Sequence, residues 1–192
     1  KDVNFVFSSS CTVYGQPDVL PVTEDAAVKP AQSPYGNTKQ IAEEILEETA
    51  AVKKNLKVSS LRYFNPVGAH ASAKIGELPI GVPQNLVPFI TQTASGKREK
   101  LTVFGTDYAT ADGSCVRDYI HVVDLAKAHV AALKALQKPN AANYDVFNIG
   151  PDQDSGVTVK FIAQTVVNIA CPNAKIKYGL GSKGWVGDVP RF

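Results

Sequence analysis

The chain has 192 residues, of which 44% are hydrophobic and 20% charged, and this composition is typical of a globular protein that buries a core. A net charge of +2 is too small to predict binding to nucleic acid or to a membrane surface, and no run approaches the ~20 apolar residues that span a bilayer. The three cysteines are widely spaced, so we expect no metal site and a reducing, cytoplasmic compartment.

An apolar run at the start of the chain predicts a buried parallel strand over residues 1–10. The run ends in the hydroxyls of Ser8, Ser9 and Ser10. Open α/β sheets place their sites outside the carboxyl ends of the strands. We therefore expect a functional site where this strand ends.

A helix is predicted after the Pro- and Asp-rich loop over residues 15–34. Ser33 is a suitable N-cap ahead of Pro34, and the helical pattern runs to about residue 54. Its apolar stripe is expected to be Ile41, Ala42, Ile45 and Leu46. The acidic residues opposite this stripe are expected to form a solvated face, and they are Glu43, Glu44, Glu47 and Glu48.

Tyr35 and Lys39 lie four residues apart on this helix, so their side chains share one face. A tyrosine titrates near ~10, and a nearby positive charge lowers that pKa, which suits proton exchange with a substrate hydroxyl. With Ser10, the pair would supply a base, a charge and a hydroxyl. The alternative is that Lys39 forms an ordinary ion pair with Glu43, because Tyr-x-x-x-Lys occurs by chance on many helices.

The rest of the chain continues to alternate strands and helices. We expect strands over residues 58–64, 101–105, 144–150 and 174–178, and helices over residues 85–95, 123–136 and 158–170. A Gly- and Pro-rich loop over residues 69–85 is of the kind that carries function. The guanidinium of Arg117 matches a phosphate, unless it pairs with Asp118 or Asp124. The histidines lack metal-ligand spacing and are expected to be structural, and they are His70, His121 and His129.

Four sequence blocks occur in one order along the chain. They read F-S-S-S-C-T-V-Y-G, S-P-Y-G-N-T-K, L-R-Y-F-N-P-V-G-A-H and V-R-D-Y-I-H-V-V-D-L-A. Together they resemble the extended short-chain dehydrogenase/reductase family and, within it, the UDP-glucose 4-epimerases. The resemblance implies an α/β fold with a partial Rossmann-like, doubly wound parallel sheet and a smaller α/β substrate-binding domain.

The resemblance also implies a division into domains. Residues 1–68 would be the later part of the NAD-binding Rossmann domain, and residues 69–192 would mainly bind the nucleotide sugar, with 101–150 returning in part to the Rossmann sheet. No G-x-G-x-x-G occurs in the sequence. The chain is therefore expected to be the central and later part of a larger subunit, inactive alone, whose full-length form is a homodimer.

Site residues are carried over from the family onto matching positions of this chain. The catalytic residues would be Tyr35, Ser10 and Lys39. The residues expected to bind NAD are Ser8, Ser9, Ser10, Tyr35, Lys39, Tyr63, Phe64 and Pro66. The residues expected to bind the UDP-sugar are Ser10, Thr12, Tyr35, Asn65, Asn85, Leu86, Val103, Phe104, Arg117, Asp188 and Phe192.

One departure from the family pattern lies near the end of the chain. Trp185 stands where many epimerases carry an arginine that holds the diphosphate, which shifts weight onto Arg117. Phe192 falls where the family limits the sugar pocket, and its size favours galactose and glucose over their N-acetyl forms.

The implied activity is the NAD-dependent interconversion of UDP-galactose and UDP-glucose, through oxidation at C4 and re-reduction on the other face. One alternative is another nucleotide-sugar epimerase or a dehydratase, although a dehydratase usually places acidic residues where Cys11 and Thr12 stand. The other alternative, from a different class, is a non-catalytic module that binds nucleotide sugars.

Overall fold

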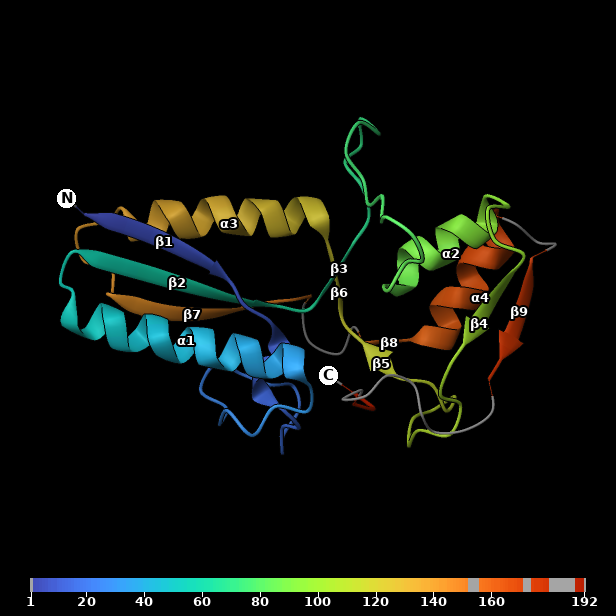
Figure 1. Ribbon diagram of the computed structural model, residues 1–192, viewed down its shortest axis with the longest axis horizontal. Helices are drawn as coiled ribbons and strands as arrows, with labels where there is room; N and C mark the ends of the chain where they lie inside the picture. The colour runs from blue at the N-terminus through green and yellow to red at the C-terminus, as the bar shows by residue number, and fades with distance from the viewer. Residues whose placement is uncertain (1, 152–155, 171–173, 180–188, 192) are drawn as a thin grey trace. The chain divides into compact units, whose positions relative to one another are not determined.

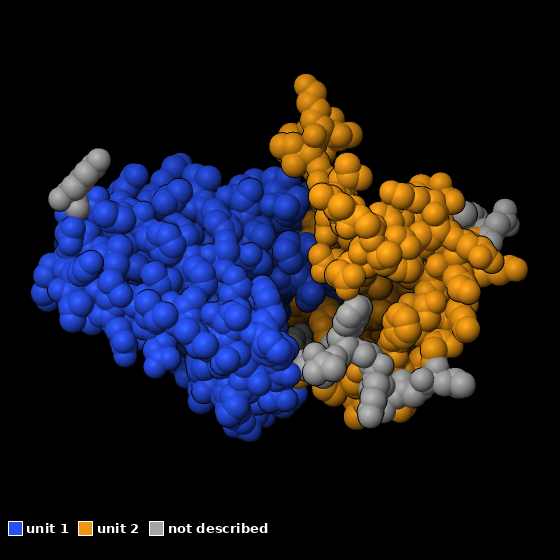
Figure 2. Space-filling view, in the orientation of Figure 1, with its two compact units in different colours: residues 1–66, 119–154 blue, residues 67–118, 155–192 orange. Residues whose placement is uncertain are grey.

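The computed structural model describes residues 2–151, 156–170, 174–179 and 189–191. The chain divides into two compact units, which Figure 2 distinguishes by colour. Unit 1 combines Lys1–Pro66 with Tyr119–Asp154, and unit 2 combines Val67–Asp118 with Ser155–Phe192. Each unit is therefore built from two separate segments of the sequence, and the segment that returns to unit 1 begins at Tyr119.

Unit 1 is a parallel sheet with helices on both of its faces (Figure 1). The strand order is β1-β2-β7, and the elements are β1 (Val3–Ser8), β2 (Leu56–Tyr63), β7 (Tyr144–Ile149), α1 (Pro34–Val52) and α3 (Val122–Leu136). Val3 lies opposite Leu56, and Val58 lies opposite Tyr144. In parallel pairing all three carboxyl ends meet at one edge, which confirms the predicted α/β class and places a site there.

The first strand is less buried than predicted. Val3 and Phe5 are 48% and 42% exposed, because β1 has a strand partner on one side only. The central strand β2 carries the buried apolar side chains instead, with Val58 and Leu61 at 0% and 1%. The apolar run of β1 was therefore correctly read as a strand, but its burial was wrong for the part of the sheet that the structure describes.

The first helix begins as predicted but buries a different face. The Ser33 hydroxyl accepts a hydrogen bond from the Gly36 amide at 3.1 Å and caps α1. The buried residues of α1 are Gly36, Glu43 and Ala50, which recur every seven residues along one stripe. Ile41 and Ile45, by contrast, are 47% and 57% exposed. The predicted stripe is thus wrong for Ile41 and Ile45, whereas Ala42 and Leu46 are partly buried. The solvated face is wrong for Glu43 and is confirmed for the exposed Glu44, Glu47 and Glu48.

Three short elements complete unit 1 and its boundary. A single 3-10 turn, η1 (Cys11–Tyr14), follows β1. The strand β3 (Asn65–Val67) pairs with β6 (Tyr119–His121). Cys11 is buried, as expected for an apolar thiol.

Unit 2 packs two helices on a parallel strand pair. Its elements are α2 (Leu86–Ala94), β4 (Lys100–Val103), β5 (Val116–Arg117), β8 (Val157–Thr158), α4 (Val159–Ala170) and β9 (Lys175–Tyr178). The strands β4 and β9 are parallel, and β5 and β8 are antiparallel. The buried centre of this unit is Ile90, Leu101, Val103 and Ala163. Although β4 lies within the range expected to return to the Rossmann sheet, it pairs with β9.

The described residues contain neither a membrane-spanning helix nor a cluster of metal ligands. None of the helices there is long and apolar enough to cross a bilayer. Likewise, no group of three or more His, Cys, Asp or Glu side chains in that part of the chain is arranged to hold a metal ion.

Candidate active site

The carboxyl end of β1 turns directly into η1, and Ser10 is the residue at the turn. Its backbone is extended, with φ −157° and ψ 147°, and its hydroxyl oxygen accepts from the Thr12 amide at 3.3 Å and the Thr12 hydroxyl at 3.0 Å. These contacts fix the Ser10 oxygen at the edge of the sheet where a ligand would lie.

The phenol of Tyr35 meets Ser10 from the first turn of α1. The phenol lies within hydrogen-bonding reach of Ser10, while 53% of the Tyr35 surface remains exposed. Burial raises the pKa of Tyr35 above its ordinary value, and the hydrogen bond with Ser10 only partly offsets this effect. From the sequence, Lys39 was expected to lower the pKa of Tyr35, but in this chain the net shift of that pKa is upward.

The ammonium of Lys39 lies beside the same phenol. Its Nζ atom is 5.5 Å from the centre of the Tyr35 ring and 5.2 Å from that of Phe7. It donates a hydrogen bond to the Ser8 carbonyl at 2.9 Å. Glu43, the alternative partner weighed for this lysine, pairs with Arg62 instead. The structure thus brings Ser10, Tyr35 and Lys39 together in unit 1.

The end of β2 contributes the aromatic residues of the site. Tyr63 is partly buried, and its ring centre is 6.2 Å from that of His129 on α3. A Cβ atom at Gly150 would lie 2.8 Å from the ring of Phe64, so only glycine lets Phe64 keep this position. Asn65 and Pro66 follow in β3 and are exposed.

His129, which was expected to be structural, contacts Ser8 at the end of β1. Its Nδ1 atom is 2.9 Å from the Leu125 carbonyl, which can only accept, so Nδ1 carries the proton. In the neutral ring, Nε2 then accepts from the Ser8 hydroxyl at 3.2 Å. This contact was missed from the sequence, although the position of His129 on the helix predicted over residues 123–136 could have suggested it.

A buried polar network lies directly beneath the site, and the helical pattern did not predict it. Both oxygens of Glu43 accept from Arg62, at 2.6 Å from Nη2 and 3.0 Å from Nε, and Oε1 also accepts from the Ser9 hydroxyl at 2.5 Å. Arg62 Nη1 donates to the Tyr14 hydroxyl at 2.9 Å, which donates to Asn148 at 2.8 Å. The hydroxyl of Ser9 is thus committed to the protein interior.

The charges of this network are coupled. Burial alone would lower the pKa of Arg62, but its hydrogen bonds with Glu43 and Tyr14 and the attraction of Glu43 outweigh burial and raise it. Burial raises the pKa of Tyr14, although Arg62 and Asn148 oppose the shift. Tyr14 therefore keeps its proton and donates it to Asn148 in a hydrogen bond.

Unit 2 holds the other residues that the family pattern suggests for substrate. Asn85 is the N-cap residue of α2 and donates from Nδ2 to Glu77 at 2.9 Å. Leu86 packs against the core, Val103 is 2% exposed and Phe104 is 60% exposed. Buried Val103 has its side chain inside the unit, whereas the ring of Phe104 is accessible to a ligand.

The guanidinium of Arg117 forms hydrogen bonds within unit 2. Its Nη1 atom donates to the carbonyls of Val116 and Val189, at 2.8 and 2.7 Å. Asp124, one of its alternative partners, pairs with Lys127 at 3.0 Å. Three positions of the family pattern lie outside the described residues, namely Trp185, Asp188 and Phe192.

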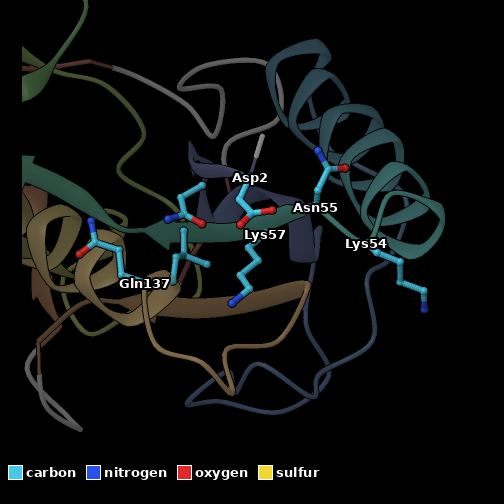
Figure 3. A pocket seen from close by; sticks show the side chains of 7 residues that line it. Asp2, Lys54, Asn55, Lys57 and Gln137 are labelled. Atoms are coloured by element: carbon cyan, nitrogen blue, oxygen red, sulfur yellow. The ribbon is translucent and has the colours of Figure 1, made fainter.

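A separate shallow pocket lies at the other edge of the sheet in unit 1 (Figure 3). Polar residues at the start of β1 and β2 line it, including Asp2, Asn55 and Lys57, together with Gln137 at the end of α3. This is the amino edge of the parallel strands. The hydroxyls, phenol and ammonium described above all lie at the carboxyl edge, which is where such sheets bind ligands.

The chain resembles UDP-glucose 4-epimerases. It is 55% identical over 148 residues to the UDP-glucose 4-epimerase of Haemophilus influenzae, covering 77% of this chain and 43% of the relative. It is 53% identical over 146 residues to that of Drosophila melanogaster, covering 76% of this chain and 42% of the relative. The chain thus spans less than half the length of these curated relatives.

Solved structures agree with this similarity. A UDP-glucose 4-epimerase from Stenotrophomonas maltophila, with bound NAD and formylated UDP-arabinopyranose, matches with a TM-score of 0.85 and 44% identity, over 98% of this chain and 54% of that chain. The enzyme of Bifidobacterium longum, in complex with NAD+ and UDP, matches over the same shares with a TM-score of 0.87 and 39% identity. Residues 1–150 match the model of the NAD dependent epimerase/dehydratase family. On the strength of this match and of the relatives, the chain belongs to the NAD dependent epimerase/dehydratase family.

Proposed function

We propose that the whole protein containing this chain interconverts UDP-galactose and UDP-glucose with NAD, by oxidation at C4 of the sugar and re-reduction on the other face. The proposal is supported by relatives of 53–55% identity that are named UDP-glucose 4-epimerases. The observation that carries it is the arrangement of Ser10, Tyr35 and Lys39 at the carboxyl edge of the sheet.

Tyr35 is the group that moves the proton of the sugar's 4-hydroxyl. Its phenol is half exposed, so a ligand can reach it, and Ser10 fixes its direction. Ser10 then donates to or accepts from the same sugar oxygen, while Thr12 holds the Ser10 oxygen in place. Lys39 adds a positive charge that favours the phenolate over the phenol. These three roles together form a general acid–base device.

The residues at this edge fit the nicotinamide and ribose end of NAD. A lysine held by the Ser8 carbonyl retains ammonium hydrogens suited to ribose hydroxyls, and the aromatic rings of Tyr63 and Phe64 suit a flat ring. When bound, NAD+ supplies a hydride acceptor and a positive charge. Lys39, Tyr63 and Phe64 would hold it, with the backbone around Ser8 and Pro66.

The residues of unit 2 would bind the UDP part of the substrate. The exposed ring of Phe104 suits contact with a base, and a guanidinium such as that of Arg117 suits a phosphate. Asn85 and Leu86 would contribute from the start of α2. Strong binding through UDP leaves the sugar free to turn over in the site between oxidation and reduction.

The oligomeric state and the cellular location of the whole protein are inferred in the same way. We infer from the family resemblance that the whole protein is a homodimer in the cytoplasm. Sedimentation equilibrium tests the first statement, since a mass equal to one subunit at micromolar concentration would contradict it.

The experiment measures conversion of UDP-galactose to UDP-glucose by the whole protein and its Tyr35→Phe variant. Loss of one acid–base group typically costs about 10²–10⁴-fold in kcat. The matched control is Tyr178→Phe, because this tyrosine lies on β9 and hydrogen-bonds Gln164 on α4. Equal activity of the unaltered protein and Tyr35→Phe would overturn the assignment of Tyr35, and binding of UDP-galactose without any turnover would favour the non-catalytic module.

A further inference from the structure

The buried network beneath the site joins the helix that carries Tyr35 to the strand end that carries Ser10. Glu43 is 6% exposed and lies on α1, two steps of four residues after Tyr35 and one after Lys39. An acidic side chain buried on a helix face is costly unless it is paired and hydrogen-bonded. Glu43 therefore needs charged and hydrogen-bonding partners, which a solvated glutamate does not need.

The partners of Glu43 come from two different strands. Ser9, just after β1, donates to its Oε1 atom at 2.5 Å, and Arg62 on β2 donates to both oxygens. The Ser9 amide also donates to the Leu61 carbonyl at 2.9 Å, so the three groups lie at one level of the sheet. One carboxylate thus fixes how far α1 can slide along the ends of β1 and β2.

Ser9 lies between Ser8 and Ser10, the two residues that contact Lys39 and Tyr35. On one side, the Ser8 carbonyl accepts from Lys39 at 2.9 Å. On the other, Ser10 lies within hydrogen-bonding reach of the Tyr35 phenol. Both Lys39 and Tyr35 belong to α1, the helix that Glu43 fixes. Three side chains of α1 therefore contact three successive serines after β1. Lys39 meets Ser8, Glu43 meets Ser9 and Tyr35 meets Ser10.

We propose that Glu43, held by Arg62 and Ser9, is a positioning residue that sets the register between α1 and the end of β1, and thereby the contact of Tyr35 with Ser10. Glu43 acts through Ser9. Both residues are buried, at 6% and 0% exposed, so neither side chain touches a ligand. The inference rests on the proposed function for its kinetic readout only, because the register itself is measurable without turnover.

A merely stabilising ion pair would have a different signature. Replacing a buried pair by apolar residues of similar volume is often neutral for stability or improves it. If Glu43 only stabilised the fold, Glu43→Leu/Arg62→Met would regain both stability and activity. If it sets the register, this variant regains stability while the contact between Tyr35 and Ser10 stays loose.

The experiment compares the whole protein with Ser9→Ala, Glu43→Gln and Glu43→Leu/Arg62→Met, using the exposed Glu44→Gln as the matched control. Three quantities are measured: the thermal unfolding midpoint, kcat and KM for UDP-galactose, and the titration midpoint of Tyr35 in protein free of nucleotide. The last is followed by 13C NMR of tyrosines labelled at Cζ, with Tyr35→Phe identifying the signal. Groups facing the phenol are Ser10, Cys11, Tyr63 and Lys39.

We expect Ser9→Ala and the apolar double variant to keep kcat about 10–100-fold below the unaltered protein with KM changed little, since small misplacements of reacting groups have costs of this order. We also expect the Tyr35 midpoint to fall toward the ordinary value of ~10, because a loosened phenol is better hydrated. Glu44→Gln should leave all three quantities unchanged.

Recovery of kcat and of the Tyr35 midpoint in the apolar double variant would overturn the proposal. An unchanged Tyr35 midpoint in Ser9→Ala would do so as well, and this variant removes only one hydroxyl, which keeps the test valid even if the Glu43 variants fail to fold. If the unaltered protein shows no epimerisation, the proposed function fails, but the Tyr35 midpoint still decides whether Glu43 sets the register.

Discussion

Removal of the Arg62 guanidinium should destabilise unit 1 strongly. The side chains of Arg62 and Glu43 are only 7% and 8% exposed, and in Arg62→Met the carboxylate loses two donors and keeps Ser9. Breaking a buried pair by removing one partner costs about 3–5 kcal/mol, because the remaining charge stays buried without compensation. The Tyr14 hydroxyl also loses the donor from Nη1.

Native-state hydrogen exchange is the suitable assay, because it reports the free energy of opening locally, in a chain of two units. Amides of β2 in Arg62→Met should exchange with an opening free energy lower by about 3–5 kcal/mol. Lys127→Met is the control, since it breaks an ion pair whose side chains are 73% and 60% exposed and should change stability by less than about 1 kcal/mol.

Adding Glu43→Leu to Arg62→Met should restore most of the lost stability, because no buried charge then remains. A loss below about 1 kcal/mol in Arg62→Met alone would show that Glu43 finds other compensation or water. A double variant no more stable than the single one would show that packing, and not the uncompensated charge, dominates.

Three further outcomes follow from the structure. Lys39→Met should lower kcat for UDP-galactose by about 10²–10⁴-fold, and an unchanged kcat in steady-state assays would exclude a role for its charge. Burial alone would raise the pKa of Asp112, but hydrogen bonds from Thr158 and Ser114 outweigh burial and hold the pKa below its ordinary value. In urea unfolding, the unaltered protein should therefore have a higher free energy of unfolding than Asp112→Asn. This difference should be complete above about pH 4 and vanish as the pH falls through the folded pKa. A difference that grows on acidification would contradict this sign. Gly113→Ala should destabilise unit 2 by about 1–3 kcal/mol in the same measurement, because φ is +80° and a Cβ atom would lie 2.1 Å from the Thr106 carbonyl oxygen, so a neutral effect would contradict the strain.

The sequence predicted those features that depend on local patterns. Ser33 and Pro34 determine where α1 begins, because capping and a fixed φ act within one turn. The meeting of Ser10 and Tyr35 could be expected because strand ends in a parallel sheet share one edge. The aromatic residues at the end of β2, Tyr63 and Phe64, were expected at the site from the family resemblance alone.

Features that depend on pairing between distant residues were not predictable from periodicity. Glu43 reads as one of four similar glutamates, and only its position opposite Arg62 and Ser9 distinguishes it. Ile41 and Ile45 look like core residues, but the close approach of Gly36 and Ala50 turns another face of α1 toward the sheet. The pKa of Tyr35 was also misjudged, because burial of the phenol outweighs its favourable contacts.

A double-mutant cycle tests most directly whether Ser10 and Tyr35 act on one sugar oxygen. We would measure kcat/KM for UDP-galactose in the whole protein and in Ser10→Ala, Tyr35→Phe and the double variant. The account predicts that the double variant loses little more than the worse single variant, since residues that act as one unit are strongly non-additive. Losses that multiply fully would contradict it.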